Sequence, residues 1–549
     1  MSTTDEESYF LWFSDIHFDP HYSTPRAYNV EGVCNLTSLP AIGKHGCDSP
    51  ETLVRSTFEA AAVVTAAAPS KPSFIIITGD SIRHGMDGLF INNTAYENNF
   101  HAILNTSHYA EAMEAAGHVM SNLSAILNEY FPETQIIVSV GNNDVVPDYY
   151  LELKEESTPL GNLSLSVEDA GMLGVLYSAL SNEHTSTTKR GRGLLTQADE
   201  WTFLRGGYYS RMLHNGNLIV LSLNTVLYAS YFGPDPTNEF DPGKQFLWMR
   251  KMMEYSRERQ CQVIIIGHVP PTLGSYRHNQ FWKDEYVQLY YSLIEEYDDV
   301  VIAQLFGHLH SDEFRVGGKT VASMNTEAKT QMIPFVNSPL LLGPSVTPIH
   351  GNYPAFRLVK YGRVGGGNGQ YAKGKFKLLD YESFRSLMDI GENWTKLYTF
   401  SEVYSSNYVR EDGLSSHTMN SIVESMEDTL EGKESRILKT FRSFVLSGAA
   451  GESQHAGSVM ECNELCRDEW LCTFRSATSD GYESCLLMRR ESREKAESIL
   501  FVTLAAVFGT VAALWIVIRW TKARRRRNYE KTPSVTRDTG PSIEAIERL

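Results

Sequence analysis

Short apolar runs of strand length recur between residues 9 and 360, and they constrain the fold more than any other feature of the chain. They are YFLWFS (9–14), FIIIT (74–78), IIVSV (136–140), LIVLSL (218–223), VIII (263–266) and VIAQLF (301–306). Each run is apolar on both faces, as expected for a central strand that is covered on two sides. Helix-like stretches such as 49–68 and 108–131 lie between them. The alternation predicts a layered α/β domain over residues 8–360.

Side chains that can bind metals follow five of these runs directly. They are Asp15 and His17 after the first run, Asp80 and His84 after the second, Asn142 and Asn143 after the third, His268 after the fifth, and His308 and His310 after the sixth. The carboxyl ends of strands in an open α/β sheet converge on the ligand crevice, so these residues should meet. One such motif alone is most often structural. Five of them, each behind a strand, predict a two-metal centre, the usual clamp for phosphoryl chemistry.

The order of the motifs D-x-H, G-D, G-N-x-D, G-H and G-H-x-H resembles the calcineurin-like metallophosphoesterases. The stretches SDIHFDPHY, GCDSP, GPSVTP and CNELCRDEWLCTF look like the branch that holds acid sphingomyelinase, its phosphodiesterase relatives and endopolyphosphatase. Three further stretches, TGDSIRHGMD (78–87), GNNDVVP (141–147) and GHVPP (267–271), look most like endopolyphosphatase. The resemblance covers residues 9 to about 486 and implies an α/β/β/α sandwich.

The resemblance also implies a role for each residue of the expected centre. The first metal would be held by Asp15, His17, Asp80 and His310, and the second by Asn142, His268 and His308, with Asp80 bridging. Zn²⁺ is the first expectation, because carboxylate, imidazole and amide oxygen suit borderline divalent ions, and Mn²⁺, Fe²⁺ or Co²⁺ are alternatives. A metal-bound hydroxide would attack phosphorus in line.

Two residues are expected to act beside the metals. His84 would face the phosphate or the leaving group, although a lone histidine in this position is also compatible with a surface residue. Asn143 stands where the commoner family pattern, G-N-H, has a histidine that is thought to protonate the leaving oxygen. An amide has no titratable proton near neutral pH, so Asn143 favours phosphoanhydride substrates, which need little protonation. Asp144 and Asp148 are interpreted as loop residues that make structural hydrogen bonds.

Three functions remain open at this point. The leading hypothesis is an endopolyphosphatase-like hydrolase of inorganic polyphosphate. The alternative is an acid sphingomyelinase-like phosphodiesterase that acts on a phospholipid or a nucleotide, and the third is a non-catalytic membrane receptor or scaffold. The net charge of −17 argues against nucleic-acid binding.

The region 375–490 is expected to form a helical, cysteine-containing C-terminal subdomain, with residues 380–445 helical and polar. Disulfides are predicted from six cysteines in two local groups: Cys34, Cys47, Cys462, Cys466, Cys472 and Cys485. A zinc knuckle from the last four is the alternative, but their spacing lacks the paired C-x2-C pattern. Sequons mark six glycosylation candidates: Asn35, Asn92, Asn105, Asn122, Asn162 and Asn393.

Residues 499–518 form an uncharged apolar run long enough to cross a bilayer as a helix. Residues 519–549 carry nine Lys/Arg against four Asp/Glu, which leaves about −22 for the rest of the chain. The positive-inside rule therefore predicts a cytoplasmic tail and a lumenal or extracellular catalytic domain, on a lysosome- or vacuole-like acidic organelle or the cell surface. The acidic start, MSTTDEESYF, shows no signal-peptide pattern, which conflicts with that orientation.

Overall fold

The computed structural model describes residues 7–24, 34, 40–90, 106–153, 165–181, 193–231, 240–275, 277–317, 332–364, 375–388, 394–404, 413–427, 435–448 and 462–529. The chain divides into two units, Met1–Leu486 and Leu487–Leu549. The first holds all of the described strands, and the second consists, within the described residues, of the continuation of one long helix.

Two six-stranded sheets form the centre of the first unit. The first sheet has the order β12-β11-β10-β1-β2-β3, and the second has the order β4-β5-β6-β7-β9-β8. The strands are β1 (Ser8–Phe13), β2 (Phe74–Ile77), β3 (Gln135–Val138), β4 (Tyr209–Leu213), β5 (Leu218–Ser222), β6 (Gln262–Ile266), β7 (Val301–Phe306), β8 (Glu313–Arg315), β9 (Leu340–Leu342), β10 (Ala355–Val364), β11 (Lys375–Ser386) and β12 (Trp394–Thr399). Strands β1, β2 and β3 run parallel, as do β5, β6 and β7. Their carboxyl ends therefore share one edge in each sheet.

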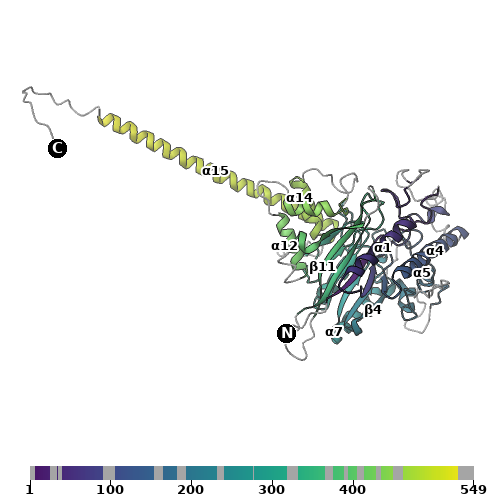
Figure 1. Cartoon of the computed structure of the whole chain (residues 1–549). Coiled ribbons are helices and arrows are strands. Elements are labelled where there is room, and N and C mark those ends of the chain that lie inside the picture. Colours follow the sequence, from purple (N-terminus) through teal and green to yellow (C-terminus); the bar gives the residue numbers. More distant parts are fainter. Residues whose placement is uncertain are drawn as a thin grey trace, which may run out of the picture. The chain divides into compact units, whose positions relative to one another are not determined.

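Helices cover the sheets, and α1, α4 and α5 gather on one side of the strands while α12 and α14 lie on the other (Figure 1). The α-helices are α1 (Glu51–Ala67), α4 (Ser107–Tyr130), α5 (Met172–Ser181), α6 (Glu200–Gly206), α7 (Gln245–Arg259), α8 (Asp284–Glu296), α10 (Phe400–Val403), α12 (Ser416–Glu427), α13 (Arg436–Phe444), α14 (Glu464–Arg475) and α15 (Ser479–Tyr529). Single 3₁₀ turns occur at η1 (Asp87–Leu89), η2 (His214–Gly216), η3 (Thr225–Tyr228) and η4 (Pro242–Lys244).

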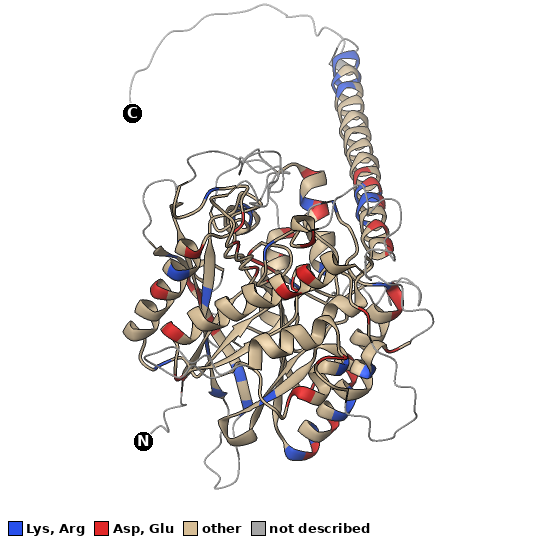
Figure 2. Cartoon of the chain, turned by 90° about the vertical axis from the view of Figure 1, so that its right-hand side faces the viewer, with Lys and Arg blue, Asp and Glu red and all other residues tan. Residues whose placement is uncertain are grey.

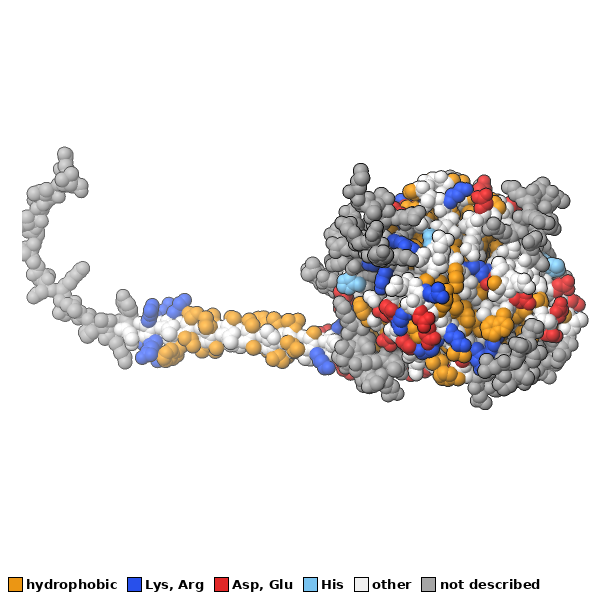
Figure 3. All heavy atoms as spheres, turned by 90° about the horizontal axis from the view of Figure 1, so that it is seen from below, with side chains coloured by type: hydrophobic (Ala, Val, Ile, Leu, Met, Phe, Trp, Pro, Cys, Tyr) orange, Lys and Arg blue, Asp and Glu red, His pale blue; other side chains and the backbone are white. Residues whose placement is uncertain are grey.

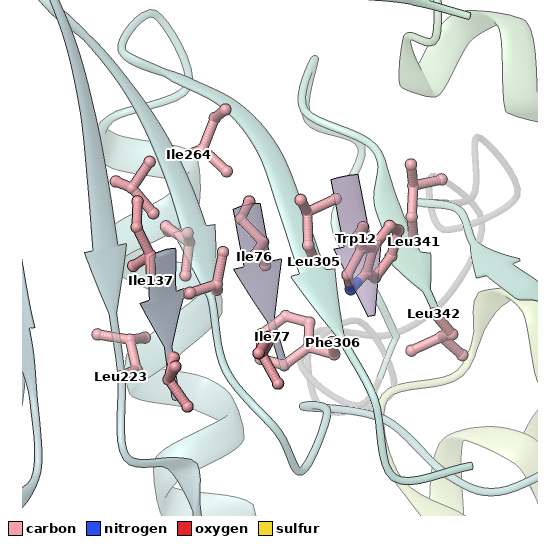
Figure 4. Close-up of a cluster of buried hydrophobic side chains, with 14 of the residues drawn as sticks. Trp12, Ile76, Ile77, Ile137, Leu223, Ile264, Leu305, Phe306, Leu341 and Leu342 are labelled. Carbon is pink, nitrogen blue, oxygen red and sulfur yellow. The ribbon is translucent and has the colours of Figure 1, made fainter. Parts of the chain in front are cut away.

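The main apolar core lies between the two sheets. Figure 4 shows side chains of the first sheet, such as Trp12, Ile76 and Ile137, directed toward those of the second, such as Ile264 and Leu305. All five are at most 1% exposed. Burying apolar area at about 25 cal/mol per Å² is the main force that holds the sheets face to face. This packing fixes the positions of the loops at the strand ends.

All six predicted strands are confirmed, as are the helices expected over 49–68 and 108–131. The expectation of helices from residue 380 is wrong in part, because β11 and β12 extend the first sheet to Thr399. β10 and β11 pair antiparallel on either side of residues 365–374, so the expected domain end at 360 falls inside a hairpin. The polar, alternating sequence of these strands reflects one partly exposed face of the sheet, and its composition resembles that of a polar helix.

The C-terminal part of the first unit is helical and disulfide-bonded. Three disulfides join Cys34 to Cys47, Cys462 to Cys466 and Cys472 to Cys485, which confirms the predicted disulfides over a zinc knuckle. Backbone hydrogen bonds from Val316 to Phe474 and from Ile333 to Arg475 attach the end of α14 to the second sheet's loops. Of the glycosylation candidates, Asn122 is exposed on α4, and Asn35, Asn92, Asn105, Asn162 and Asn393 lie outside the described residues.

Helix α15 carries the predicted membrane segment. Among the described residues it is the one helix long and apolar enough to cross a membrane. Its uncharged stretch, 499–518, is bounded at its far end by a group of Lys and Arg side chains, which Figures 2 and 3 show in blue. The helix continues to Tyr529, and residues 530–549 lie outside the described part of the chain.

The core makes a direct stability prediction. Truncating Ile76, which is 0% exposed, to Ala should lower stability by about 2–5 kcal/mol, because a cavity is left between the sheets. The matched change Val63→Ala, on a residue of α1 that is 65% exposed, should alter stability by less than about 0.5 kcal/mol. Thermal unfolding of the two purified variants measures both changes in stability. Equal melting temperatures would contradict the assignment of Ile76 to the core between the sheets.

Candidate metal centre

The residues that the sequence marks as metal ligands converge at the carboxyl ends of strands from both sheets. β1, β2 and β3 of the first sheet lead into three of the loops, and β6 and β7 of the second sheet lead into two. Five of the seven expected ligands have positive φ: Asp15 (50°), His17 (44°), Asp80 (52°), His308 (73°) and His310 (55°). This conformation is uncommon for residues with a Cβ, and such strain concentrates at functional sites.

The carboxylate of Asp80 lies at the middle of the cluster. Its Oδ2 is 3.4 Å from Nε2 of His17 and 3.1 Å from Nε2 of His268. Asn143 donates to the same carboxylate twice, from its backbone N–H to Oδ1 (2.9 Å) and from Nδ2 to Oδ2 (2.8 Å). Asp80 thus contacts both groups of expected ligands, which is the position that a bridging carboxylate needs.

Asp15 organises the side of the cluster assigned to the first metal. Its Oδ1 is 3.3 Å from Nε2 of His310, and its two oxygens accept from the backbone N–H of His308 at 3.0 and 3.1 Å. Ligand atoms of Asp15, His17 and Asp80 lie within 4.8 Å of one another. The two aspartates and a histidine could therefore share one cation.

The side assigned to the second metal is built from Asn142, His268 and His308. Nε2 of His268 is 3.0 Å from Oδ1 of Asn142, and ligand atoms of Asp80, His268 and His308 lie within 4.8 Å of one another. Asn142 donates from Nδ2 to Oδ1 of Asp148 (2.7 Å), so its amide oxygen is turned toward the centre. The other nitrogen of His268, Nδ1, is 2.7 Å from the carbonyl oxygen of Thr78, which sets the direction of the ring.

The hydrogen bonding of two buried imidazole nitrogens shows whether the expected ligands suit a cation. Nε2 of His17 and Nδ1 of His310 make no hydrogen bond within the described structure, although both atoms are buried. Burial lowers the pKa of His17 to about 3 and holds the pKa of His310 well below its usual range. Both rings are therefore neutral, the form in which imidazole binds metals. Unpaired, neutral, buried nitrogens fit a metal ligand and are costly otherwise.

The carboxylates fit the same interpretation. Burial together with the nearby charge of Asp80 raises the pKa of Asp15 to about 7. Burial would also raise the pKa of Asp80, but His268 and the backbone N–H of Asn143 hold it well below the usual range. Two buried carboxylates that oppose each other's ionisation are stabilised by a divalent cation placed between them.

Glycines at the strand ends allow these close approaches. A Cβ on Gly141 would lie 2.1 Å from Oδ1 of Asp80, and a Cβ on Gly307 would lie 2.1 Å from Oγ of Ser14 and 2.8 Å from Oδ2 of Asp15. Real side chains do not tolerate such distances. The glycines that precede Asn142 and His308 are therefore required for the carboxylates to pack against the neighbouring loops.

His84 lies beside the centre, as the sequence predicts for a residue near the phosphate. Its ring stacks on that of His17, with centroids 3.9 Å apart, and its side chain is 17% exposed. Both carboxylate oxygens of Asp48 bind it, one at Nδ1 and one at the backbone N–H, each at 2.9 Å. Burial opposes ionisation of His84, but Asp48 raises the pKa of the imidazole above its usual value.

Sequence reasoning missed several residues of this site. Asp48 follows Cys47 in the GCDSP stretch, and His350 packs on His310 with ring centroids 4.5 Å apart. The hydroxyl oxygen of Tyr149 lies 3.2 Å from Nε2 of His308. None follows a predicted strand directly, and only the GCDSP stretch carried a signal, as part of the family resemblance.

Asp144 has the structural role expected of it. One of its carboxylate oxygens accepts from the backbone N–H groups of Ser81 and Ile82, and the other accepts from Gly141. It therefore joins the loop after β2 to the loop after β3. Asp148 also makes a hydrogen bond, but to the side chain of Asn142, so it orients an expected ligand.

A substitution at Gly141 tests this packing. Gly141→Ala should abolish most metal binding, because the new Cβ displaces Asp80. Gly88→Ala is the matched control, since a Cβ at Gly88 meets nothing within 4 Å. Elemental analysis of the two purified variants measures the number of cations bound to each. If Gly141→Ala bound as many cations as the unchanged protein, the close packing of Gly141 against Asp80 would not be needed for metal binding.

Comparisons with known proteins identify the family of this chain. The family model for calcineurin-like phosphoesterase matches residues 8–312. The chain is 23% identical over 507 residues to acid sphingomyelinase-like phosphodiesterase 3b of Homo sapiens, covering 88% of this chain and 90% of that protein. It is 24% identical over 493 residues to a human cyclic GMP-AMP phosphodiesterase (87% and 89% covered). It is 25% identical over 448 residues to sphingomyelinase phosphodiesterase D of Dictyostelium discoideum (76% and 84% covered).

Solved structures show lower similarity. A dimetal phosphatase from Danio rerio matches at 11% identity with a TM-score of 0.32, covering 68% of this chain and 98% of that one. The structure of PhoD matches at 11% identity with a TM-score of 0.36, covering 77% and 78%. The family match spans more than half of the sequence and ends just beyond His310, the last of the seven expected ligands. The chain therefore belongs to the calcineurin-like phosphoesterases, hydrolases of phosphoester bonds that use divalent metal ions.

Proposed function

We propose that this protein is a two-metal phosphodiesterase. The observation that carries the proposal is the meeting of seven potential ligands, from the ends of five strands in two sheets, around the carboxylate of Asp80. The choice of a phosphodiester follows from the relatives, several of which are named as phosphodiesterases. The names of the three relatives given above carry no reference to polyphosphate.

Each ligand keeps the role that the resemblance implies. The first cation would be held by Asp15, His17, Asp80 and His310, and the second by Asp80, Asn142, His268 and His308. When bound, the two cations would neutralise the phosphate oxygens and lower the pKa of a water molecule that attacks phosphorus. Zn²⁺ is the first candidate, because the set mixes imidazole with carboxylate and amide oxygen.

The surrounding residues orient the ligands and the substrate. Asp148 fixes the amide of Asn142, and the carbonyl oxygen of Thr78 fixes the ring of His268. Asp48 fixes the ring of His84 through Nδ1, and on this proposal the ring faces the phosphate or the leaving group. We assign His84 to that contact, since its ring lies against His17 and is partly exposed.

Asn143 bears on the choice between a phosphodiester and polyphosphate as the substrate. Its side chain donates to Asp80 and is 5% exposed, so it holds the bridging carboxylate in place. It supplies no acid for the leaving group, which keeps polyphosphate as a second candidate, because a phosphoanhydride oxygen leaves without protonation. Arg83, the cation nearest to His84 in the sequence, is 2% exposed and pairs with Asp19, so it is not free to bind a polyanion. We therefore favour a diester with a good leaving group.

Helix α15 would attach the enzyme to a membrane. An uncharged segment followed by Arg and Lys residues matches a transmembrane helix with its basic end in the cytoplasm. On this proposal the catalytic unit is lumenal or extracellular, which agrees with its disulfides, because such bonds form in oxidising compartments.

A substrate panel tests the proposed reaction. The metal-loaded protein would be given bis-p-nitrophenyl phosphate, sphingomyelin, ATP and long-chain polyphosphate at acidic and neutral pH. We expect turnover of the diester and loss of turnover after chelation of the metal. Hydrolysis of polyphosphate alone would replace the proposal with the second candidate, and turnover that survives complete metal removal would contradict both.

Removing one ligand should leave one metal site. His310→Ala should lower the bound cations from about two to about one per chain and reduce diester turnover by roughly 100-fold or more, because both cations act on one phosphate. His118→Ala is the matched control, since its side chain on α4 is 75% exposed. Elemental analysis and initial rates give both values. Unchanged metal content in His310→Ala would remove His310 from the ligand set.

Asn143 makes a prediction about leaving groups. Asn143→His should raise turnover of an alkyl diester relative to a p-nitrophenyl diester by about 10-fold or more, because an imidazole can protonate an alkoxide. Asn143→Gln keeps an amide and should leave this ratio unchanged. Metal content is measured in parallel, since both changes alter the contact with Asp80. If Asn143→His retained its cations and showed the same ratio of alkyl to p-nitrophenyl diester turnover as the unchanged protein, Asn143 would not be the position of a missing proton donor.

A further inference from the structure

Two aromatic side chains lie beside His308, at the edge of the second-metal side of the centre, and a third packs on one of them. The ring of Phe281 is 4.8 Å from the ring of His308 between centroids, and the ring of Tyr149 is 6.2 Å from it. The ring of Tyr231 is in turn 5.9 Å from that of Tyr149. They come from three different loops, which follow β3, β5 and β6. These three residues are called the aromatic wall below.

Backbone hydrogen bonds hold two members of the aromatic wall in register. The N–H of Ser230 donates to the carbonyl oxygen of Phe281 (2.7 Å), and the N–H of Lys283 donates to that of Tyr228 (3.0 Å). The N–H of Phe281 also donates to the carbonyl oxygen of Thr272 (3.1 Å), in the segment that follows His268. Phe281 is therefore anchored on the same loop that carries the expected ligand His268.

Tyr149 is held in a conformation that a bulky residue rarely adopts. Its φ is 60°, in the left-handed region. Its backbone N–H donates to the carbonyl oxygen of Asn142 (3.1 Å), and its hydroxyl is 3.2 Å from Nε2 of His308. Strain of this kind persists only where the surroundings impose it, and it is common at ligand-binding sites. Tyr149 thus connects the wall to two expected ligands of the second metal.

The geometry favours a surface for stacking over a cage for a cation. Rings whose centroids are 5.9 Å apart are already in contact, so no ammonium group fits between Tyr149 and Tyr231. Tyr231 is 61% exposed, which is high for a tyrosine that packs against another ring. An exposed ring that rests on a fixed ring offers a flat apolar face to a ligand.

We propose that the aromatic wall binds a nucleobase of the substrate, so that the phosphodiester cleaved at the metal centre is a nucleotide ester. This inference rests on the proposed function and adds the class of substrate. Stacking of a base on an aromatic side chain contributes roughly 5- to 100-fold in affinity and tolerates different bases. Tyr149 contacts both Tyr231 and His308, so its phenol would lie between a base stacked on the wall and a phosphate at the centre.

Three esters with the same leaving group test the proposal: thymidine 5′-monophosphate p-nitrophenyl ester, methyl p-nitrophenyl phosphate and p-nitrophenyl phosphorylcholine. All release p-nitrophenolate, so the acid that Asn143 lacks plays no part. Tyr231→Ala in the metal-loaded full chain should raise KM for the thymidine ester roughly 5- to 100-fold and leave KM for the methyl ester within about twofold. Tyr231→Phe keeps the ring and should behave as the unchanged protein.

Tyr255→Ala is the matched control. Tyr255 is an exposed tyrosine on α7, which leads into the amino end of β6, opposite the end that carries His268. Equal changes in KM for the thymidine and methyl esters, or no change, would mean that Tyr231 only packs, and the proposal would be overturned. A change confined to the choline ester would overturn it in favour of a lipid headgroup. Failure of the unchanged protein to hydrolyse any of the esters would overturn the proposed function itself.

Discussion

The charge of one buried carboxylate, Asp80, is the constraint on which the rest of the site depends. A buried anion is costly unless every oxygen is paired. Here one oxygen faces two imidazoles and the amide of Asn143, and the other accepts a backbone N–H. These partners come from the loops after β1, β3 and β6, so satisfying Asp80 brings the two sheets' loops together. Packing between the sheets holds them there.

The strand ends, and the ligands behind them, could be predicted because that signal is local. An apolar run gives a strand, and the next residues in the chain give the ligand, so Asp15, Asp80 and His268 needed no knowledge of the fold. Asp48 and Tyr149 could not be found this way. Asp48 lies 36 residues from His84, and Tyr149 lies 159 residues from His308. Only folding brings these pairs together, and their sequence neighbours carry no period or strand signal.

The same reason explains the error in the C-terminal region. β11 and β12 alternate polar and apolar residues because only one face of their end of the sheet is covered, and such a polar, mixed composition is also typical of a surface helix. The disulfides could be predicted because cysteines that lie close together in the sequence are themselves a local signal of pairing. The position of the disulfide-bonded C-terminal helices could not be predicted from the sequence. In the structure, the backbone carbonyls of Phe474 and Arg475 accept hydrogen bonds from the loops of the second sheet.

On the proposed function, the substrate preference would follow from the residues that surround the metal centre more than from the metals. Asn143 holds Asp80 and donates no proton to a leaving group. Arg83 is paired with Asp19, and the wall beside His308 is aromatic. On the proposed function, an uncharged, flat group esterified to a phosphate fits these described residues better than a chain of phosphates, because Arg83 already pairs with Asp19.

The central claim is that two cations share Asp80, and electron paramagnetic resonance of the Mn²⁺-loaded protein tests it most directly. Ions bridged by one carboxylate lie about 3.5–4 Å apart and couple magnetically. The account predicts a spin-coupled dimanganese spectrum that is lost in Asp80→Asn. A spectrum of isolated Mn²⁺ ions alone, at full loading of the unchanged protein, would contradict it.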